Sequence, residues 1–161
     1  MVLDKEIDAA EVLTVEEGLH ESDDATSEED YLLATIIARQ IDALLKYRRG
    51  ETDAALILMM SAAEAENGRP LYYGPPHVPK PSNELTGEML LSLGRPEEAV
   101  AFFKESLTRS TGRTQSLLGL ARAQEAISDP KAAETWQTLE SNWRGDSADI
   151  RDLQYSWLGE S

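Results

Sequence analysis

The chain nearly repeats itself between residues 81 and 143, and this limits its fold more than any single residue does. When PSNELTGEMLLSLGRPEEAVAFFKESL is aligned with TQSLLGLARAQEAISDPKAAETWQTLE, four pairs stand out: Gly87 with Ala121, Gly94 with Ser128, Ala99 with Ala132, and Phe103 with Trp136. Their offsets are 34, 34, 33 and 33 residues, so we expect the turn at 128–130 to be one residue shorter than the preceding one. A period in the low thirties, with helix-forming residues around a turn, is typical of stacked helix pairs, which usually bind other proteins.

A divergent first copy of the repeat precedes a proline-rich connection. Apolar residues recur with helical spacing from 28 to 49, which predicts an amphipathic helix ended by Gly50. A second helix follows as far as residue 67, and we interpret its Met59 and Met60 as core residues. Four prolines lie in the eleven residues from Pro70 to Lys80, a density that excludes helix and favours a stiff extended connection.

These patterns predict an all-α chain with about three antiparallel helix pairs and a C-terminal capping helix. The expected segments are an acidic arm at 1–27 and a helical domain at 28–158, with pairs at 28–67, 81–109 and 114–143 and a cap at 148–158. In the cap, Leu153 and Trp157 are four residues apart and are expected to cover the exposed end of the stack.

The charge is concentrated at the N-terminus. The 161 residues carry a formal charge of −15, of which −11 falls in residues 1–30. Because phosphate binding needs a basic face, nucleic acid is disfavoured as a partner. The chain has no cysteine and two histidines, so neither a thiolate nor a multi-histidine metal site is expected. No secretory leader or membrane-length apolar run occurs, so we expect a soluble protein without membrane insertion, cytoplasmic if Met1 is the native start.

The repeat resembles the tetratricopeptide repeat (TPR) family. That family's pattern has a small residue, a turn glycine, a second small residue and an aromatic where the second pair has Gly87, Gly94, Ala99 and Phe103. The resemblance covers 81–139 well and 28–67 more weakly. The block YYGPPHVPKPSNELTGEMLLSLGRPEEAV is similar to the C-terminal region of uncharacterised bacterial TPR proteins. This resemblance implies a TPR-like α-solenoid that acts as a scaffold for protein–protein interaction.

The resemblance also implies which residues face the concave groove. In this family, positions on the first helix of each pair contact the ligand. Carried over to this chain, they include Glu84 and Glu88 in the second pair and Gln115, Arg122 and Glu125 in the third. Carboxylates in the groove would repel an acidic peptide tail, so we expect a protein or peptide partner with basic or donor-rich character.

Several of these residues have alternative roles. Lys80, Glu84 and Glu88 are four residues apart and could equally form a solvated charge ladder. Arg122 could form a structural ion pair with Glu84 or Glu88, or grip a ligand. Tyr73, in the YYGPP loop, could add a contact at the edge of the groove or fill the gap left by the long connection.

Enzymatic activity is not expected. Glu84 and Glu88 are the only carboxylate pair worth considering for hydrolysis, and no nucleophile, phosphate loop or metal motif accompanies them. We therefore expect a non-catalytic module without cofactor or metal. Two alternatives remain: a self-assembling homo-oligomeric domain, or a terminal docking domain of a larger enzyme or transport system.

Overall fold

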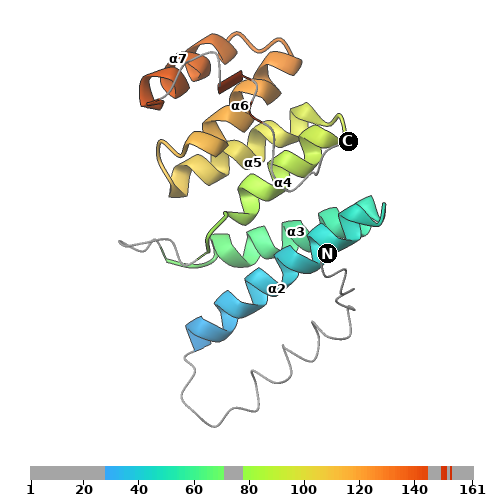
Figure 1. The fold of residues 1–161 in the computed structure, drawn as a ribbon. Helices are drawn as coiled ribbons and strands as arrows, with labels where there is room; N and C mark the ends of the chain where they lie inside the picture. The colour runs from blue at the N-terminus through green and yellow to red at the C-terminus, as the bar shows by residue number, and fades with distance from the viewer. Residues whose placement is uncertain (1–27, 71–77, 145–149, 152, 154–161) are drawn as a thin grey trace, which may run out of the picture. The chain divides into compact units, whose positions relative to one another are not determined.

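The structure, a computed structural model, describes residues 28–70, 78–144, 150, 151 and 153. These residues contain six helices and no strand, which confirms the all-α prediction for the described part of the chain (Figure 1). The helices are α2 (Glu28–Arg48), α3 (Thr52–Asn67), α4 (Ser82–Ser92), α5 (Pro96–Arg109), α6 (Thr114–Ala126) and α7 (Ala132–Asn142). None of the described helices is long and apolar enough to cross a bilayer.

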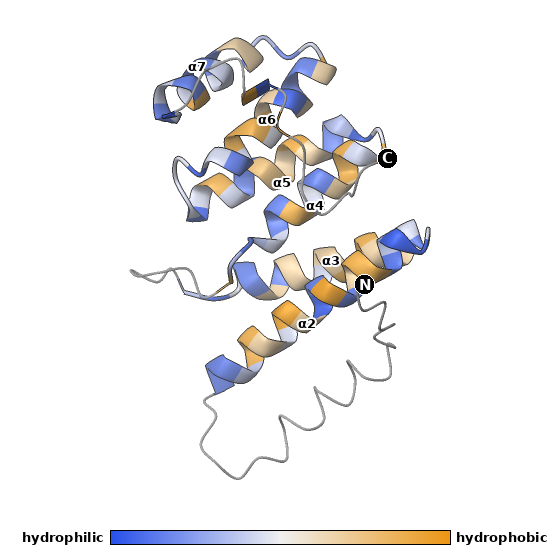
Figure 2. Ribbon diagram, in the orientation of Figure 1, coloured by the Kyte–Doolittle hydropathy of each residue, from blue (hydrophilic) through white to orange (hydrophobic). Residues whose placement is uncertain are grey.

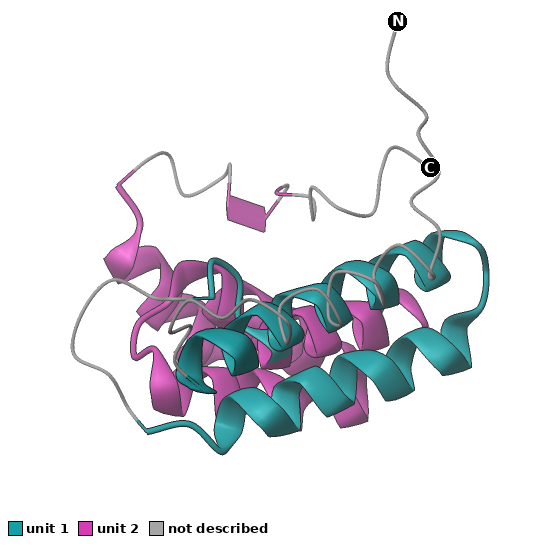
Figure 3. Ribbon diagram, turned by 90° about the horizontal axis from the view of Figure 1, so that it is seen from below, with its two compact units in different colours: residues 1–82 teal, residues 83–161 magenta. Residues whose placement is uncertain are grey.

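The chain divides into two compact units, Met1–Ser82 and Asn83–Ser161 (Figure 3). In unit 1, α2 packs along α3, and Ile36, Ala62 and Val78 form a buried cluster. In both units the turns between helices are hydrophilic, whereas apolar residues lie along the helices (Figure 2). Acidic residues begin α2 and basic residues end it, an order that favours the helix dipole.

The prediction that Met59 and Met60 both belong to the core is wrong for Met60. Met59 is fully buried, whereas Met60 is 46% exposed. Adjacent residues on a helix point about 100° apart, and on α3 this step takes Met60 off the buried face to which Leu56, Met59 and Ala63 belong. Ile57, at 71% exposure, lies on the same exposed side of α3.

In unit 2, α5 packs against α6 and α6 against α7. Phe103 of α5 is fully buried, and its ring contacts two glycines. A Cβ built on Gly87 of α4 would lie 2.8 Å from the ring, and one on Gly119 of α6 would lie 2.2 Å from it. Both helices can approach this closely only because the two positions lack side chains.

Three of the turns between described helices share one geometry: α2 to α3, α4 to α5, and α6 to α7. Gly50, Gly94 and Ser128 all have positive φ angles, of 82°, 70° and 57°. In each turn this residue donates its N–H to the carbonyl three residues earlier, and the next residue donates to the carbonyl five residues before it. This is the Schellman arrangement, which satisfies the last carbonyls of a helix. The sequence alignment of Gly94 with Ser128 therefore corresponds to equivalent backbone positions.

The turn between α6 and α7 is longer than predicted. Helix α5 begins two residues after Gly94, whereas α7 begins four residues after Ser128. Pro130 and Lys131 form an additional turn, in which Ala132 donates its N–H to the carbonyl of Asp129. The expected shortening by one residue is therefore wrong, because an alignment of residue types does not reveal where the next helix starts.

Described residues after α7 pack onto the helices of unit 2. Ile150 is fully buried in a cluster with Leu117, Leu118, Ala121, Trp136 and Leu139, and Leu153 packs against that cluster. The remainder of the expected cap, including Trp157, lies outside the described residues. So do the acidic arm at 1–27 and Tyr73.

Candidate functional site

Glu84 lies in a buried polar network that joins α4, α5 and α6. Its carboxylate receives hydrogen bonds from Arg113 Nε at 2.7 Å and from Arg113 Nη2 at 3.0 Å. Ser116 Oγ donates to the same carboxylate at 2.5 Å and lies 2.9 Å from Ser106 Oγ. Because Ser116 uses its proton on Glu84, Ser106 is the donor in the second bond. Glu84, Ser106 and Ser116 are 0%, 1% and 0% exposed, so these three side chains are not accessible to a ligand from solvent.

Glu88 is also fully buried, one turn further along α4. The burial extends to every residue from 82 to 90. A solvated ladder of Lys80, Glu84 and Glu88 is therefore excluded, since neither carboxylate reaches solvent. Lys80 itself is half-buried, and its carbonyl accepts a hydrogen bond from Gln40 Nε2 at 2.9 Å.

The other predicted binding residues lie on α6. Gln115 and Arg122 are half-buried, and Glu125 is exposed. Arg122 Nη2 donates to the carbonyl of Arg151 at 3.0 Å and to that of Leu153 at 2.5 Å. Arg122 thus holds the backbone of the segment that follows α7, a role that sequence analysis did not anticipate.

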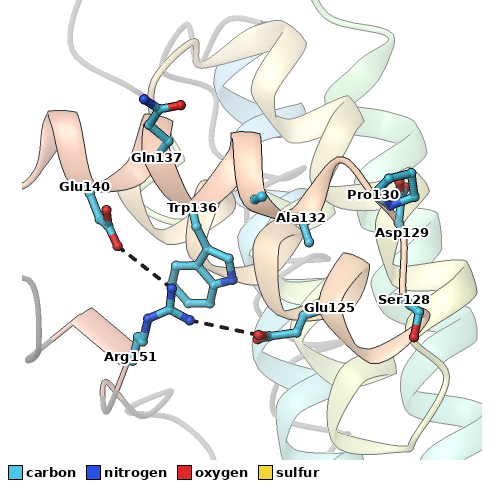
Figure 4. A pocket seen from close by; sticks show the side chains of 10 residues that line it. Glu125, Ser128, Asp129, Pro130, Ala132, Trp136, Gln137, Glu140 and Arg151 are labelled. Carbon is cyan, nitrogen blue, oxygen red and sulfur yellow. Dashed lines mark ion pairs between the residues drawn. The ribbon is translucent and has the colours of Figure 1, made fainter.

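A pocket of about 560 Å³ opens between the end of α6 and one side of α7, beside Arg151 (Figure 4). Ten residues line it: Glu125, Ser128, Asp129, Pro130, Ala132, Ala133, Trp136, Gln137, Glu140 and Arg151. The Arg151 guanidinium carbon lies 4.0 Å from the centre of the Trp136 ring. Its Nη1 is 4.0 Å from the Glu125 carboxylate, and its Nη2 is 3.9 Å from that of Glu140.

Of the residues that line this pocket, Glu125 alone was predicted from the sequence as a binding residue. Arg113 was not predicted as a site residue, although its position before a helix indicates that it pairs with an acidic side chain. A basic residue directly before a helix is unfavourable next to the positive end of the helix dipole, so Arg113 must find its anion elsewhere. Glu140 and Arg151 have no comparable signal, because only the packing of α6 on α7 brings them near Glu125.

A second pocket, of about 590 Å³, lies in unit 1 beside the start of α2 and the end of α3. At its edge Arg69 Nη2 donates to Glu29 at 2.9 Å. In the described ranges, no three His, Asp or Glu side chains are placed to hold a metal ion.

Comparison with known proteins found no matching family model, no matching curated protein and no matching solved structure. Inferences about function therefore rest on the residues and geometry of this chain.

Proposed function

We propose that this chain is a TPR-like helical-repeat module, without catalysis of its own, that binds a basic protein or peptide partner. The observation that carries the proposal is the recurrence of one Schellman turn geometry at Gly50, Gly94 and Ser128. Recurring helix pairs of this kind build extended surfaces, and such surfaces usually bind other proteins.

Two further observations support this proposal. Phe103 packs on Gly87, the pair that occupies the aromatic and small-residue positions of the family pattern. The net charge of −15 favours association with a basic partner and disfavours an acidic one.

The burial of Glu84 and Glu88 changes which residues would select the ligand. A fully buried carboxylate that is already bonded to an arginine has no free surface to offer. The proposal therefore assigns charge selection to the exposed Glu125 of α6, with the half-buried Gln115 on the same helix as a polar contact. Glu84 holds the first helix of one pair against that of the next.

The test is peptide selection on the immobilised full chain, followed by affinity measurement against salt. We expect enrichment of basic peptides whose affinity falls as salt rises. Glu125→Lys should abolish binding, whereas Glu105→Lys, the same charge change on an exposed position of α5, should retain it. Selection of no peptide, or equal loss in both variants, would refute the assignment to α6.

Self-assembly is a second candidate, because α3 exposes Ile57 at 71% and Met60 at 46%. Apolar side chains that neighbour each other on a helix surface are typical of interfaces between copies. Light scattering of the full chain would then give an oligomer that Ile57→Ser dissociates. A monomer at every concentration would exclude this candidate.

A further inference from the structure

Three side chains of unit 2, those of Trp136, Glu125 and Glu140, form a cage around the guanidinium group of Arg151. Trp136 of α7 provides an aromatic face, and Glu125 and Glu140 stand on either side of it (Figure 4). Arg151 lies over the ring at 4.0 Å from its centre, and its two terminal nitrogens reach toward the two carboxylates. Asp129 adds a third carboxylate to the lining, so the pocket is acidic even with Arg151 in place.

This geometry matches arginine better than lysine. A guanidinium is flat and can stack on an indole while its separate N–H groups point at two carboxylates. An ammonium group is a compact point charge and cannot do both from one position.

The pocket also contains a polar group that the described residues leave unsatisfied. Trp136 is 6% exposed, and its Nε1 is buried without a hydrogen-bond acceptor in the described part of the chain. The indole nitrogen lies on the side of the ring nearer Glu125 (Figure 4). A ligand that carries an acceptor, such as a peptide carbonyl, could satisfy this donor on entering.

Arg151 is firmly held by its backbone and loosely held by its side chain. Arg122 binds the carbonyls of Arg151 and Leu153, and Ile150 is fully buried. The Arg151 side chain, in contrast, is 50% exposed, and its two ion pairs are at the long limit for such contacts. The side chain can therefore leave the cage while the backbone of the segment stays in place.

We propose that this cage is a recognition site for an arginine side chain of a partner protein, and that Arg151 occupies it as an internal stand-in when no partner is bound. The inference rests on the proposed function, to which it adds the ligand group and its position. A partner's arginine displaces Arg151, stacks on Trp136 and takes over the contacts with Glu125 and Glu140. Competition with Arg151 lowers the affinity of the free chain for such a partner.

The experiment uses the full chain with Arg151→Ala and a small probe, N-acetyl-arginine methylamide. The readout is the Trp136 indole N–H signal in a nitrogen-15 NMR spectrum, assigned among the three tryptophans by through-bond experiments. N-acetyl-lysine methylamide is the matched control ligand. A second variant, Arg151→Ala with Glu125→Gln and Glu140→Gln, keeps the indole and removes both carboxylates.

We expect the arginine probe to shift the Trp136 signal saturably in Arg151→Ala, with half-saturation at a concentration at least about tenfold lower than in the wild-type chain. The lysine probe and the triple variant should show little or no shift. The proposal is overturned if wild type and Arg151→Ala respond alike, if lysine binds as well as arginine, or if removing both carboxylates has no effect.

This result is separable from that of the proposed function. If Arg151→Ala binds the arginine probe but the full chain selects no peptide, the cage stands and the interaction module fails. If the selected peptides bind without arginine and without involving Trp136, the module stands and the cage fails.

Discussion

The contact between Gly119 and Phe103 makes a quantitative prediction about stability. In Gly119→Ala the new Cβ would lie 2.2 Å from the Phe103 ring, well inside the 3.4 Å at which ordinary contact begins. The ring is fully buried and also lies close to Gly87, so little space is open to it. Overpacking of this severity lowers the free energy of unfolding by about 3 kcal/mol, and the higher helix propensity of alanine raises it by about 1 kcal/mol. The free energy of unfolding of unit 2 should therefore fall by about 2 kcal/mol.

Urea unfolding followed by tryptophan fluorescence is a suitable assay. All three tryptophans, at positions 136, 143 and 157, belong to unit 2, so their fluorescence reports on that unit. With a slope of about 1–2 kcal/mol per molar urea, the midpoint should drop by about 1–2 M. Gly68→Ala is the matched control, because Gly68 lies in unit 1, has φ of −67°, and an added Cβ would meet its nearest neighbours at 3.6 and 3.7 Å. Its fluorescence midpoint should not change.

A double-mutant cycle tests the proposed cause. Phe103→Leu shortens the side chain that the added Cβ at position 119 would meet, so Gly119→Ala should cost less in that background than in the wild type. An unchanged midpoint for Gly119→Ala, or strictly additive effects of the two substitutions, would refute the reasoning.

Three further predictions follow from single contacts. Ser128→Gly should raise the unfolding free energy by about 0.5–1 kcal/mol in the same fluorescence assay, because glycine adopts a φ of 57° without the steric cost that serine has there. Glu84→Gln should lower it by about 2 kcal/mol, because Arg113 loses its charged partner; Arg113 is 27% exposed, which keeps the loss below that of a fully buried pair. The hydrogen bond from Arg95, helped by the charge of Arg95, lowers the pKa of Glu98. This pair therefore stabilises the fold at pH values above the ordinary pKa of the carboxyl, and the stabilisation is lost as the pH falls through the lowered pKa. NMR titration of Arg95→Ala should show the pKa of Glu98 rising again, and no rise would disprove the pairing.

Part of the candidate site could be predicted from the sequence. Glu125 was predicted from the resemblance to the TPR pattern, and its side chain is exposed on α6. Glu84 shows the limit of this argument. Its neighbours on α4 include several polar residues, which suggests an exposed helix face, and yet α4 is buried from 82 to 90. Arg113 and Ser116, about thirty residues away, provide the hydrogen bonds that make this burial tolerable.

The repeat also has features that the local sequence determines and features that only the packing of helices determines. Local signals mark the helices and their turns. Gly50 and Gly94 adopt the positive φ that a Schellman turn requires, and the spacing of apolar residues defines α2. These signals act within a few residues of each other, so the sequence alone determines them. The alignment pairs Gly87 with Ala121 and Phe103 with Trp136, and Ala121 and Trp136 do lie in one buried cluster. The additional contact of Phe103 with Gly119 of α6 has no counterpart in the alignment, because it depends on how three helices meet.

Residues close in sequence thus settle the helical class, the approximate helix boundaries, the turn positions and the acidic character of this chain. Tertiary structure alone decides that Glu84 is buried against Arg113 and that Arg151 lies over Trp136 between Glu125 and Glu140. The physical reason is range. Helix propensity and capping act over one or two turns, whereas burial and ion pairing depend on side chains from other helices, whose approach is set by packing.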